Sequence, residues 1–173
     1  MYKRQNKARA ISRAAKEVWK EKHHDQFPID VFQTGSGTSS NMNANEVIAN
    51  LASKNSKLNI GPNDDVNMSQ SSNDVIPTAI KISAHIDLTK KLYPALDKLI
   101  NEIQTKAKSL KGVTKTGRTH LMDAMPIDFS DELLAWSSQL SACRNMLEVI
   151  EERFLELPQG GTAVGSGLSL IHI

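Results

Sequence analysis

Residues 129–157 read FSDELLAWSSQLSACRNMLEVIEERFLEL, and apolar side chains recur in this stretch at alternating steps of four and three. Such spacing predicts one continuous helix of roughly 43 Å, at about 1.5 Å per residue. Asp128 or Ser130 can cap its start, and Pro158 with the following glycines ends it. Helices of this length pack in bundles, often across subunits. The predicted seam consists of Phe129, Leu133, Trp136, Leu140, Cys143, Leu147, Ile150, Phe154 and Leu157.

A second helical stripe precedes this seam and extends to Gly112. We expect Pro94 to bend this helix without ending its helical pattern, and Pro77 to lie near its first turn with Ile76 outside it. The predicted stripe consists of Leu88, Leu92, Ala95, Leu99, Ile103 and Leu110.

Two further helices are expected nearer the N-terminus. Residues 1–22 are basic, with Ala8, Ile11, Ala15 and Val18 at helical spacing. Asn43 and Glu46 have the spacing of a capping box and predict the start of a short helix. Strand signals are confined to Ile29–Phe32 and Val113–Thr114, so the predicted class is mostly α.

Composition excludes several classes of protein. The 173 residues are 39% hydrophobic, 23% charged and 5% aromatic, which indicates a globular chain with an aliphatic core. The net charge of +2 is too balanced for an electrostatic nucleic-acid binder. Apolar runs fall short of the ~18 residues of a membrane span, so we expect neither a nucleic acid nor a membrane as partner. Cys143, the single cysteine, excludes a disulfide framework and a cysteine-rich zinc site, and we expect no metal.

The ends of the chain bear on its location and completeness. The basic N-terminal segment lacks the apolar core of a secretory signal, and a mitochondrial presequence is the alternative to an ordinary solvated helix. We expect a cytoplasmic protein, or a mitochondrial one if the source is eukaryotic. The chain starts inside a helix and closes on an apolar stretch, so we expect a fragment truncated at both ends.

Four segments concentrate small hydroxyl and amide side chains: residues 34–43, 61–67, 70–74 and 117–120. Glycines and helix N-termini direct backbone N–H groups at an anion, and hydroxyl and amide groups add donors. The alternative is that these segments are ordinary turns and helix caps. The fourth segment ends at His120, whose imidazole can transfer protons at neutral pH. From the residues alone, the sequence predicts a site for a small anion with histidine-mediated proton transfer.

In this order, the segments resemble the fumarase/aspartase superfamily, and most closely its class II fumarate hydratases. The resemblance extends from about Ala8 to Gly167. Its motifs are Gln33–Thr38, Asn41–Val47, Pro62–Asn67, Gln70–Asp74, Gly117–Leu121 and Gly160–Gly165. Ser36 and Ser72 favour fumarase, because aspartase typically has Ala and Thr there.

The resemblance implies a long-helix bundle that hydrates fumarate reversibly to L-malate in the citric acid cycle, without metal or organic cofactor. His120 would be the catalytic acid/base. The complete protein would be a homotetramer whose sites draw on three subunits, with a small dicarboxylate as substrate. The implied substrate-binding residues are Ser36, Gly37, Thr38, Ser71, Ser72, Asn73 and Thr119.

Departures from the family pattern qualify this expectation. The family usually has His where Gly61 stands, so the resemblance implies a weakened second anion site at Gly61, Pro62, Asn63 and Asp64. The family's serine loop, which supplies the other catalytic base, would lie beyond Gly167. We therefore expect this chain to be inactive alone.

The resemblance also implies a domain assignment. Residues 1–74 would be the C-terminal part of the N-terminal lyase domain, residues 75–167 the first long helices of the central bundle, and residues 168–173 a non-native tail. Two other functions stay open: an aspartate ammonia-lyase or other superfamily lyase, and a non-catalytic helical association module.

Overall fold

In a computed structural model, the chain is described over residues 2–33 and 37–168, and most of these residues are helical. The predicted class, mostly α, is confirmed. The chain forms two compact units, one of Met1–Ile80 with Leu157–Ile173 and one of Lys81–Glu156. The assignment of 1–74 and 75–167 to two family domains stays a prediction. Within the described ranges, no helix is both long enough and apolar enough to cross a membrane.

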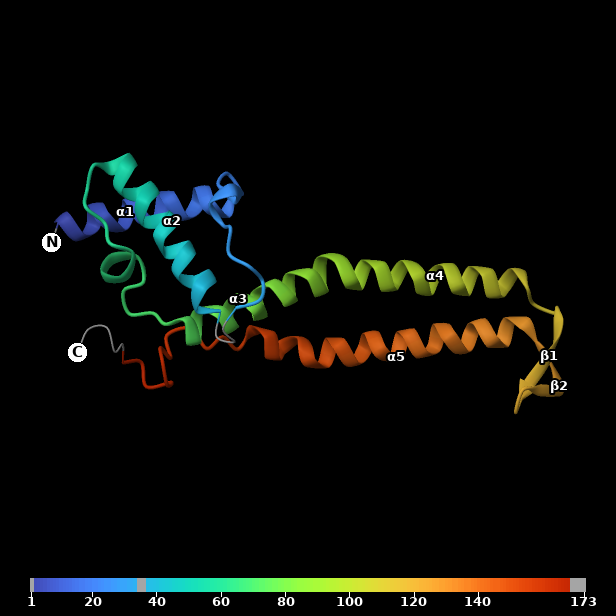
Figure 1. The fold of residues 1–173 in the computed structure, drawn as a ribbon. Helices are drawn as coiled ribbons and strands as arrows, with labels where there is room; N and C mark the ends of the chain where they lie inside the picture. Colours follow the sequence, from blue (N-terminus) through green and yellow to red (C-terminus); the bar gives the residue numbers. More distant parts are fainter. Residues whose placement is uncertain (1, 34–36, 169–173) are drawn as a thin grey trace. The chain divides into compact units, whose positions relative to one another are not determined.

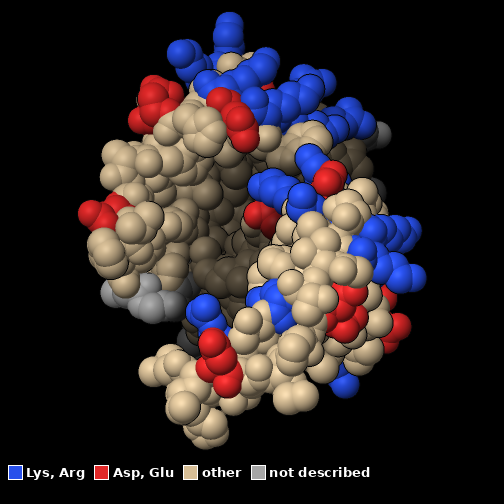
Figure 2. All heavy atoms as spheres, turned by 90° about the vertical axis from the view of Figure 1, so that its right-hand side faces the viewer, with Lys and Arg blue, Asp and Glu red and all other residues tan. Residues whose placement is uncertain are grey.

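The first unit is built on two helices, α1 (Tyr2–Trp19) and α2 (Thr38–Ser56), shown in Figure 1. Ala14 on α1 packs with Ala49 and Ala52 on α2, and Ile60 completes this buried cluster. Alanine side chains let two helices approach closely, because interaxial distance depends on side-chain size at the contact. The predicted N-terminal helix is confirmed. Figure 2 shows Lys and Arg side chains gathered together on part of the molecular surface.

The helix α2 begins five residues before the predicted capping box, so that prediction is wrong. Its N-cap is Gly37, in the left-handed conformation with φ +65°. Asn41 and Asn45 are buried, and both donate side-chain amide hydrogens to Oδ1 of Asn67, at 3.4 and 3.1 Å. Asn43 donates to the backbone oxygen of Gln26 at 3.0 Å. These tertiary bonds engage the asparagines within the helix, where sequence alone suggested a cap.

Three short helical turns connect the longer helices. One is a 3₁₀ turn, η1 (His24–Gln26), and two are π turns, η2 (Pro62–Val66) and η3 (Leu88–Leu92). The helix α3 (Ser72–Asp87) contains Pro77, and Ile76 is helical too, so the expectation for Ile76 is wrong. Pro77 is the sixth residue of α3, where its missing N–H costs only one bond, to the carbonyl of Asn73.

The second unit contains α4 (Tyr93–Ser109) and α5 (Phe129–Leu155), which run side by side. The helical path continues past Pro94, as expected, because the wider η3 turn precedes it and Pro94 falls in the first turn of α4. Asp128 caps α5, accepting a bond from the backbone N–H of Ser130 at 2.8 Å.

Of the nine predicted seam residues, five are buried or half-buried and four are exposed. Leu133 is 8% exposed and Leu140 is half-buried, whereas Trp136 is 50% exposed, Ile150 is 47% exposed and Cys143 is exposed. The predicted stripe before Gly112 divides in the same way. Leu88 is buried and Ile103 and Leu110 are half-buried, but Leu92, Ala95 and Leu99 are exposed, and Tyr93, Ile100 and Ala107 are buried instead. A single partner helix buries only one strip of its neighbour's surface. The spacing of apolar residues in the sequence therefore did not identify which strip of each helix is packed.

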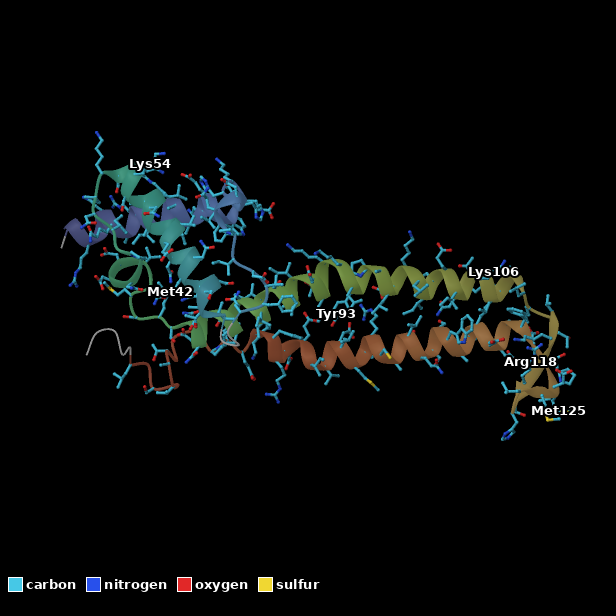
Figure 3. All side chains as sticks on the ribbon, viewed as in Figure 1. Met42, Lys54, Tyr93, Lys106, Arg118 and Met125 are labelled. Atoms are coloured by element: carbon cyan, nitrogen blue, oxygen red, sulfur yellow. The ribbon has the colours of Figure 1, made fainter. Side chains whose placement is uncertain are left out.

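Polar pairs fix the register of α4 against α5. Arg144 donates to Asp97 at 2.6 Å, and Gln104 donates to the hydroxyl of Ser137 at 3.0 Å. Tyr93 lies between the two helices in Figure 3 and donates its hydroxyl hydrogen to Glu151 at 3.1 Å. Sliding one helix by a turn would separate all three pairs.

A β-hairpin connects α4 to α5 where the sequence predicted a loop; it begins at the strand candidate Val113–Thr114 and extends well beyond it. The strands β1 (Thr114–Thr119) and β2 (Met122–Asp128) pair antiparallel, with a register shift beside Gly117. Arg118 and Met125 mark the two strands in Figure 3. By contrast, the other strand candidate, Ile29–Phe32, lies in an irregular segment.

Gly117→Ala is expected to disrupt this hairpin, because a Cβ at position 117 would lie 2.7 Å from the carbonyl oxygen of Met125. Overpacking of this kind costs about 1–3 kcal/mol. We expect at least tenfold faster hydrogen exchange at the β1 and β2 amides of the 173-residue chain. The matched control is Gly61→Ala, whose added Cβ would meet nothing nearer than 3.9 Å. Unchanged protection in the Gly117 variant would contradict the described register.

Candidate functional site

The starts of α2 and α3 bring two predicted substrate-binding residues together in the first unit. The hydroxyl oxygens of Thr38 and Ser72, the first residues of the two helices, lie 3.1 Å apart. Figure 1 shows the starts of α2 and α3 close together. Two helix N-termini therefore direct backbone N–H groups and hydroxyls toward one region, an arrangement that suits an anion.

Gly37 is required at this junction for two reasons. Its φ of +65° favours glycine, and a Cβ would lie 3.0–3.1 Å from the side chain of Ile76 on α3. A side chain at position 37 would therefore force α2 and α3 apart. The other predicted residue of this segment, Ser36, lies outside the described residues.

Ser71 and Asn73 are held by local hydrogen bonds. The hydroxyl oxygen of Ser71 accepts a bond from the backbone N–H of Asn73 at 3.2 Å. The side-chain amide of Asn73 donates to the carbonyl oxygen of Ala163 at 3.0 Å, which ties it to the segment after α5. Asn73 is nevertheless exposed, so a ligand can reach its amide.

Asp74 is the buried charge of this region, and sequence reasoning did not select it. It is 1% exposed. One carboxylate oxygen accepts from the backbone N–H of Ser71 at 2.9 Å; the other accepts from the N–H groups of Gly160 and Thr162, at 3.0 and 2.9 Å. Burial alone would raise the pKa of Asp74, but these bonds outweigh it and hold the pKa below the usual value.

A signal for Asp74 was present in the sequence. Ser71 and Asp74 have the Ser-x-x-Asp spacing of a capping box, in which the acidic side chain bonds back to the N–H at the helix start. The structure shows that bond, from the Ser71 N–H to Asp74.

Thr119 and His120 belong to the second unit, whereas the other described donors belong to the first. His120 and Leu121 form the two-residue turn of the hairpin, with φ of +52° and +61°. This is the pattern of a type I′ turn, for which Asn-Gly is the favoured pair. Both residues are exposed, so the imidazole is open to solvent.

The predicted second anion site lies at the η2 turn. Asn63 and Asp64 are exposed, but the N–H of Gly61 already donates to Asp65 at 2.9 Å. Lys7 donates to the same carboxylate oxygen at 2.7 Å. This bond is the main reason why the pKa of Asp65 lies below its usual value. An anion would have to compete with Asp65 for the Gly61 N–H, and the site stays a prediction.

The described residues contain no cluster of three or more His, Cys, Asp or Glu side chains able to hold a metal ion. Apart from the buried Asp74, the polar groups at the starts of α2 and α3 are hydroxyls, amides and backbone N–H groups. Such an arrangement can bind a carboxylate through neutral donors.

Comparison with known proteins gives the family. A family model described as "Lyase" matches residues 2–171. The chain belongs to this lyase family. The class II fumarate hydratase of Xylella fastidiosa strain Temecula1 is 52% identical over 162 residues, covering 94% of this chain and 34% of that protein. The class II fumarate hydratase of Mycobacterium tuberculosis H37Rv is also 52% identical, with the same coverage.

A solved structure gives the same result for the fold. The crystal structure of a class II fumarase from Schistosoma mansoni matches this chain with a TM-score of 0.87 and 40% identity. It covers 94% of this chain, which covers 35% of that structure. The resemblance to class II fumarate hydratases is thus confirmed, and the chain spans about a third of the length of these relatives.

The lowered pKa of Asp74 predicts how its bonds respond to acid. The carboxylate is charged in the folded chain at pH values where an unfolded Asp, with a pKa near ~3.9, takes up a proton. Its contribution to stability is therefore complete above about pH 4 and is lost as pH falls through the lowered pKa.

We expect an acid-dependent loss of hydrogen-exchange protection at the Gly160 and Thr162 amides, after correction for intrinsic exchange. Asp74→Asn, which cannot titrate, is expected to lack this step. An identical step in the variant would show that other groups cause it.

Proposed function

We propose that this lyase chain is part of a fumarate hydratase that adds water reversibly to fumarate to form L-malate. The observation that carries the proposal is the meeting of Thr38 and Ser72 at two helix starts, in a chain 52% identical to class II fumarate hydratases. The substrate would be a small dicarboxylate, and no step would need a metal or organic cofactor.

The proposed chemistry matches the donor set. Hydration converts the carbon–carbon double bond into a single bond and breaks one O–H bond of water, placing the hydroxyl on one carbon and a proton on the other. In the reverse direction, removal of a proton beside a carboxylate increases the negative charge on that carboxylate. Donors held in place at Thr38, Ser72 and Asn73 would therefore stabilise the transition state more than the ground state.

His120 would transfer the proton of the added or departing water, with Thr119 beside it. The hairpin supports this role by exposing the imidazole in a turn that non-glycine residues rarely adopt. Residues held in such conformations concentrate at functional sites, where surrounding structure maintains them. A second base for the carbon-bound proton would come from a segment beyond Gly167.

We also propose that the complete protein assembles as a homotetramer. Trp136 and Ile150 on α5, with Leu92 and Leu99 along η3 and α4, are large apolar side chains left substantially exposed. An exposed apolar surface of this kind is typical of an interaction site. We place the protein in the cytoplasm, because Cys143 is a free, exposed thiol that suits a reducing compartment.

The 173-residue chain alone is expected not to hydrate fumarate, because it supplies only part of the proposed site. A hybrid enzyme, in which this chain replaces the matching third of the Xylella fastidiosa hydratase, is expected to be active. Loss of fumarate absorbance measures both reactions. Turnover by the chain alone would contradict the first expectation. A folded hybrid that releases ammonia from aspartate but does not hydrate fumarate would favour the ammonia-lyase alternative.

In the hybrid enzyme, His120→Asn is expected to lower kcat about 10²–10⁴-fold, the usual contribution of acid/base catalysis. The matched control is His24→Asn, since the His24 side chain is 75% exposed and lies outside every predicted site. The loss of kcat should occur in the first variant only. Activity within a few-fold of the parent hybrid would exclude the acid/base role.

A further inference from the structure

We propose that Asp74 is a positioning residue, which holds the donors of Ser71–Asn73 in place by bonding the start of α3 to the turn Gly160–Thr162. The effect of Asp74 on substrate binding rests on the proposed function. The hydrogen bonds of Asp74 belong to the fold and do not depend on that function.

Asp74 joins two segments that are far apart in sequence. Its bonds to Gly160 and Thr162 cross 86 and 88 residues, and its bond to Ser71 crosses only three. The carboxylate therefore fixes the loop after α5 to the first turn of α3. Since all four residues belong to the first unit, this link is internal to one compact body.

The donors lie immediately beside this link. Ser72 and Asn73 directly precede Asp74, and Ser71 shares a hydrogen bond with each of Asn73 and Asp74. The amide of Asn73 is bonded to Ala163, one residue beyond Thr162. A shift of the Gly160–Thr162 turn would therefore carry the partner of Asn73 with it and change the direction of the Asn73 amide.

The link requires a carboxylate. Three N–H groups converge on two oxygens, and each oxygen must accept. An asparagine offers one accepting oxygen, and its NH₂ group would face at least one N–H donor. A buried donor without a partner is costly, so the segments would separate until water reached it.

The conformation of Thr162 indicates that the link acts against strain. Thr162 is buried and has φ +59°, a left-handed conformation that a β-branched residue rarely adopts. Its N–H bond to Asp74 and the bonds of its hydroxyl to the carbonyls of Gly161 and Leu168 hold it there. Without Asp74 the turn would relax, and a displacement of about 1 Å at a binding group can cost ~10²-fold in rate.

A positioning role and a purely structural role predict different kinetics. A variant that only unfolds part of the population lowers the apparent kcat at unchanged KM. Displaced donors instead weaken the binding of substrate and of the transition state, so KM rises and kcat falls.

In the hybrid enzyme, Asp74→Asn is expected to raise KM for fumarate at least tenfold. Asp65→Asn is the matched control, because Asp65 also accepts a backbone N–H in the first unit but does not contact Ser71–Asn73. We expect its KM to stay within twofold. If Asp74→Asn does not fold, Asp74→Glu takes its place, since it keeps both acceptor oxygens but displaces them, and the same rise is expected. A KM within twofold of the parent for a folded Asp74 variant would overturn the proposal.

A double-mutant cycle tests the route of the effect. If Asp74 acts through Asn73, then Asp74→Asn should raise KM less in an Asn73→Ala background than in the parent hybrid. Rises that simply multiply would show that the residues act independently and would overturn the proposed route.

Hydrogen exchange on the 173-residue chain separates this proposal from the proposed function. Asp74→Asn should lose protection at Gly160 and Thr162 whether or not the hybrid is active. An inactive but folded parent hybrid would refute the hydratase function while leaving the link measurable. Retained protection at both amides would refute the link itself.

Discussion

A carboxylate withdrawn from water is stable only if donors replace its hydration shell, and in this protein three backbone N–H groups do so for Asp74. The arrangement of the first unit around the start of α3 depends on this one group. It accepts from Ser71 on one side and from the Gly160–Thr162 turn on the other, so two distant segments share one charge. Because a neutral side chain could not accept all three bonds, the carboxylate also explains why this polar junction stays closed rather than filling with water.

The second unit is held together in a different way. Its two long helices pack through a narrow apolar strip, and the polar pairs Asp97–Arg144, Gln104–Ser137 and Tyr93–Glu151 lie along the same strip. Apolar side chains can slide past one another at little cost, but these pairs match at one register only. A charged pair that is half in water adds little stability, so its main effect is to select the alignment.

The sequence was sufficient for the helices whose apolar side chains repeat over many turns, since a helical period of that length rarely arises in any other structure. It was insufficient where two local signals competed. Asn43–Glu46 and Ser71–Asp74 both have the spacing of a capping box. Only the second forms the bond from the backbone N–H to the acidic side chain, because α2 already begins at Thr38 and Asn43, inside that helix, donates to the backbone oxygen of Gln26. The hairpin was missed for a related reason. Its strands are largely exposed and carry Thr, Lys, Arg and Pro, so no alternation of buried and exposed apolar residues marked them. The sequence also did not show which strip of α5 packs against α4. Apolar residues cover more of the circumference of α5 than one partner helix can bury.

The segments that carry the family motifs differ from ordinary turns more clearly in their backbone strain than in their composition. In the part of the chain that the structure describes, six non-glycine residues have positive φ. Glu21 and Lys57 follow the ends of α1 and α2, where a left-handed residue commonly terminates a helix. The others, Ser69, His120, Leu121 and Thr162, all border or belong to the segments from which the hydratase resemblance came. A left-handed conformation costs a non-glycine residue roughly 1–2 kcal/mol, and a plain turn could avoid that cost with Gly or Asn. The left-handed conformations of His120 and Thr162 therefore indicate that these segments are more than connections between helices.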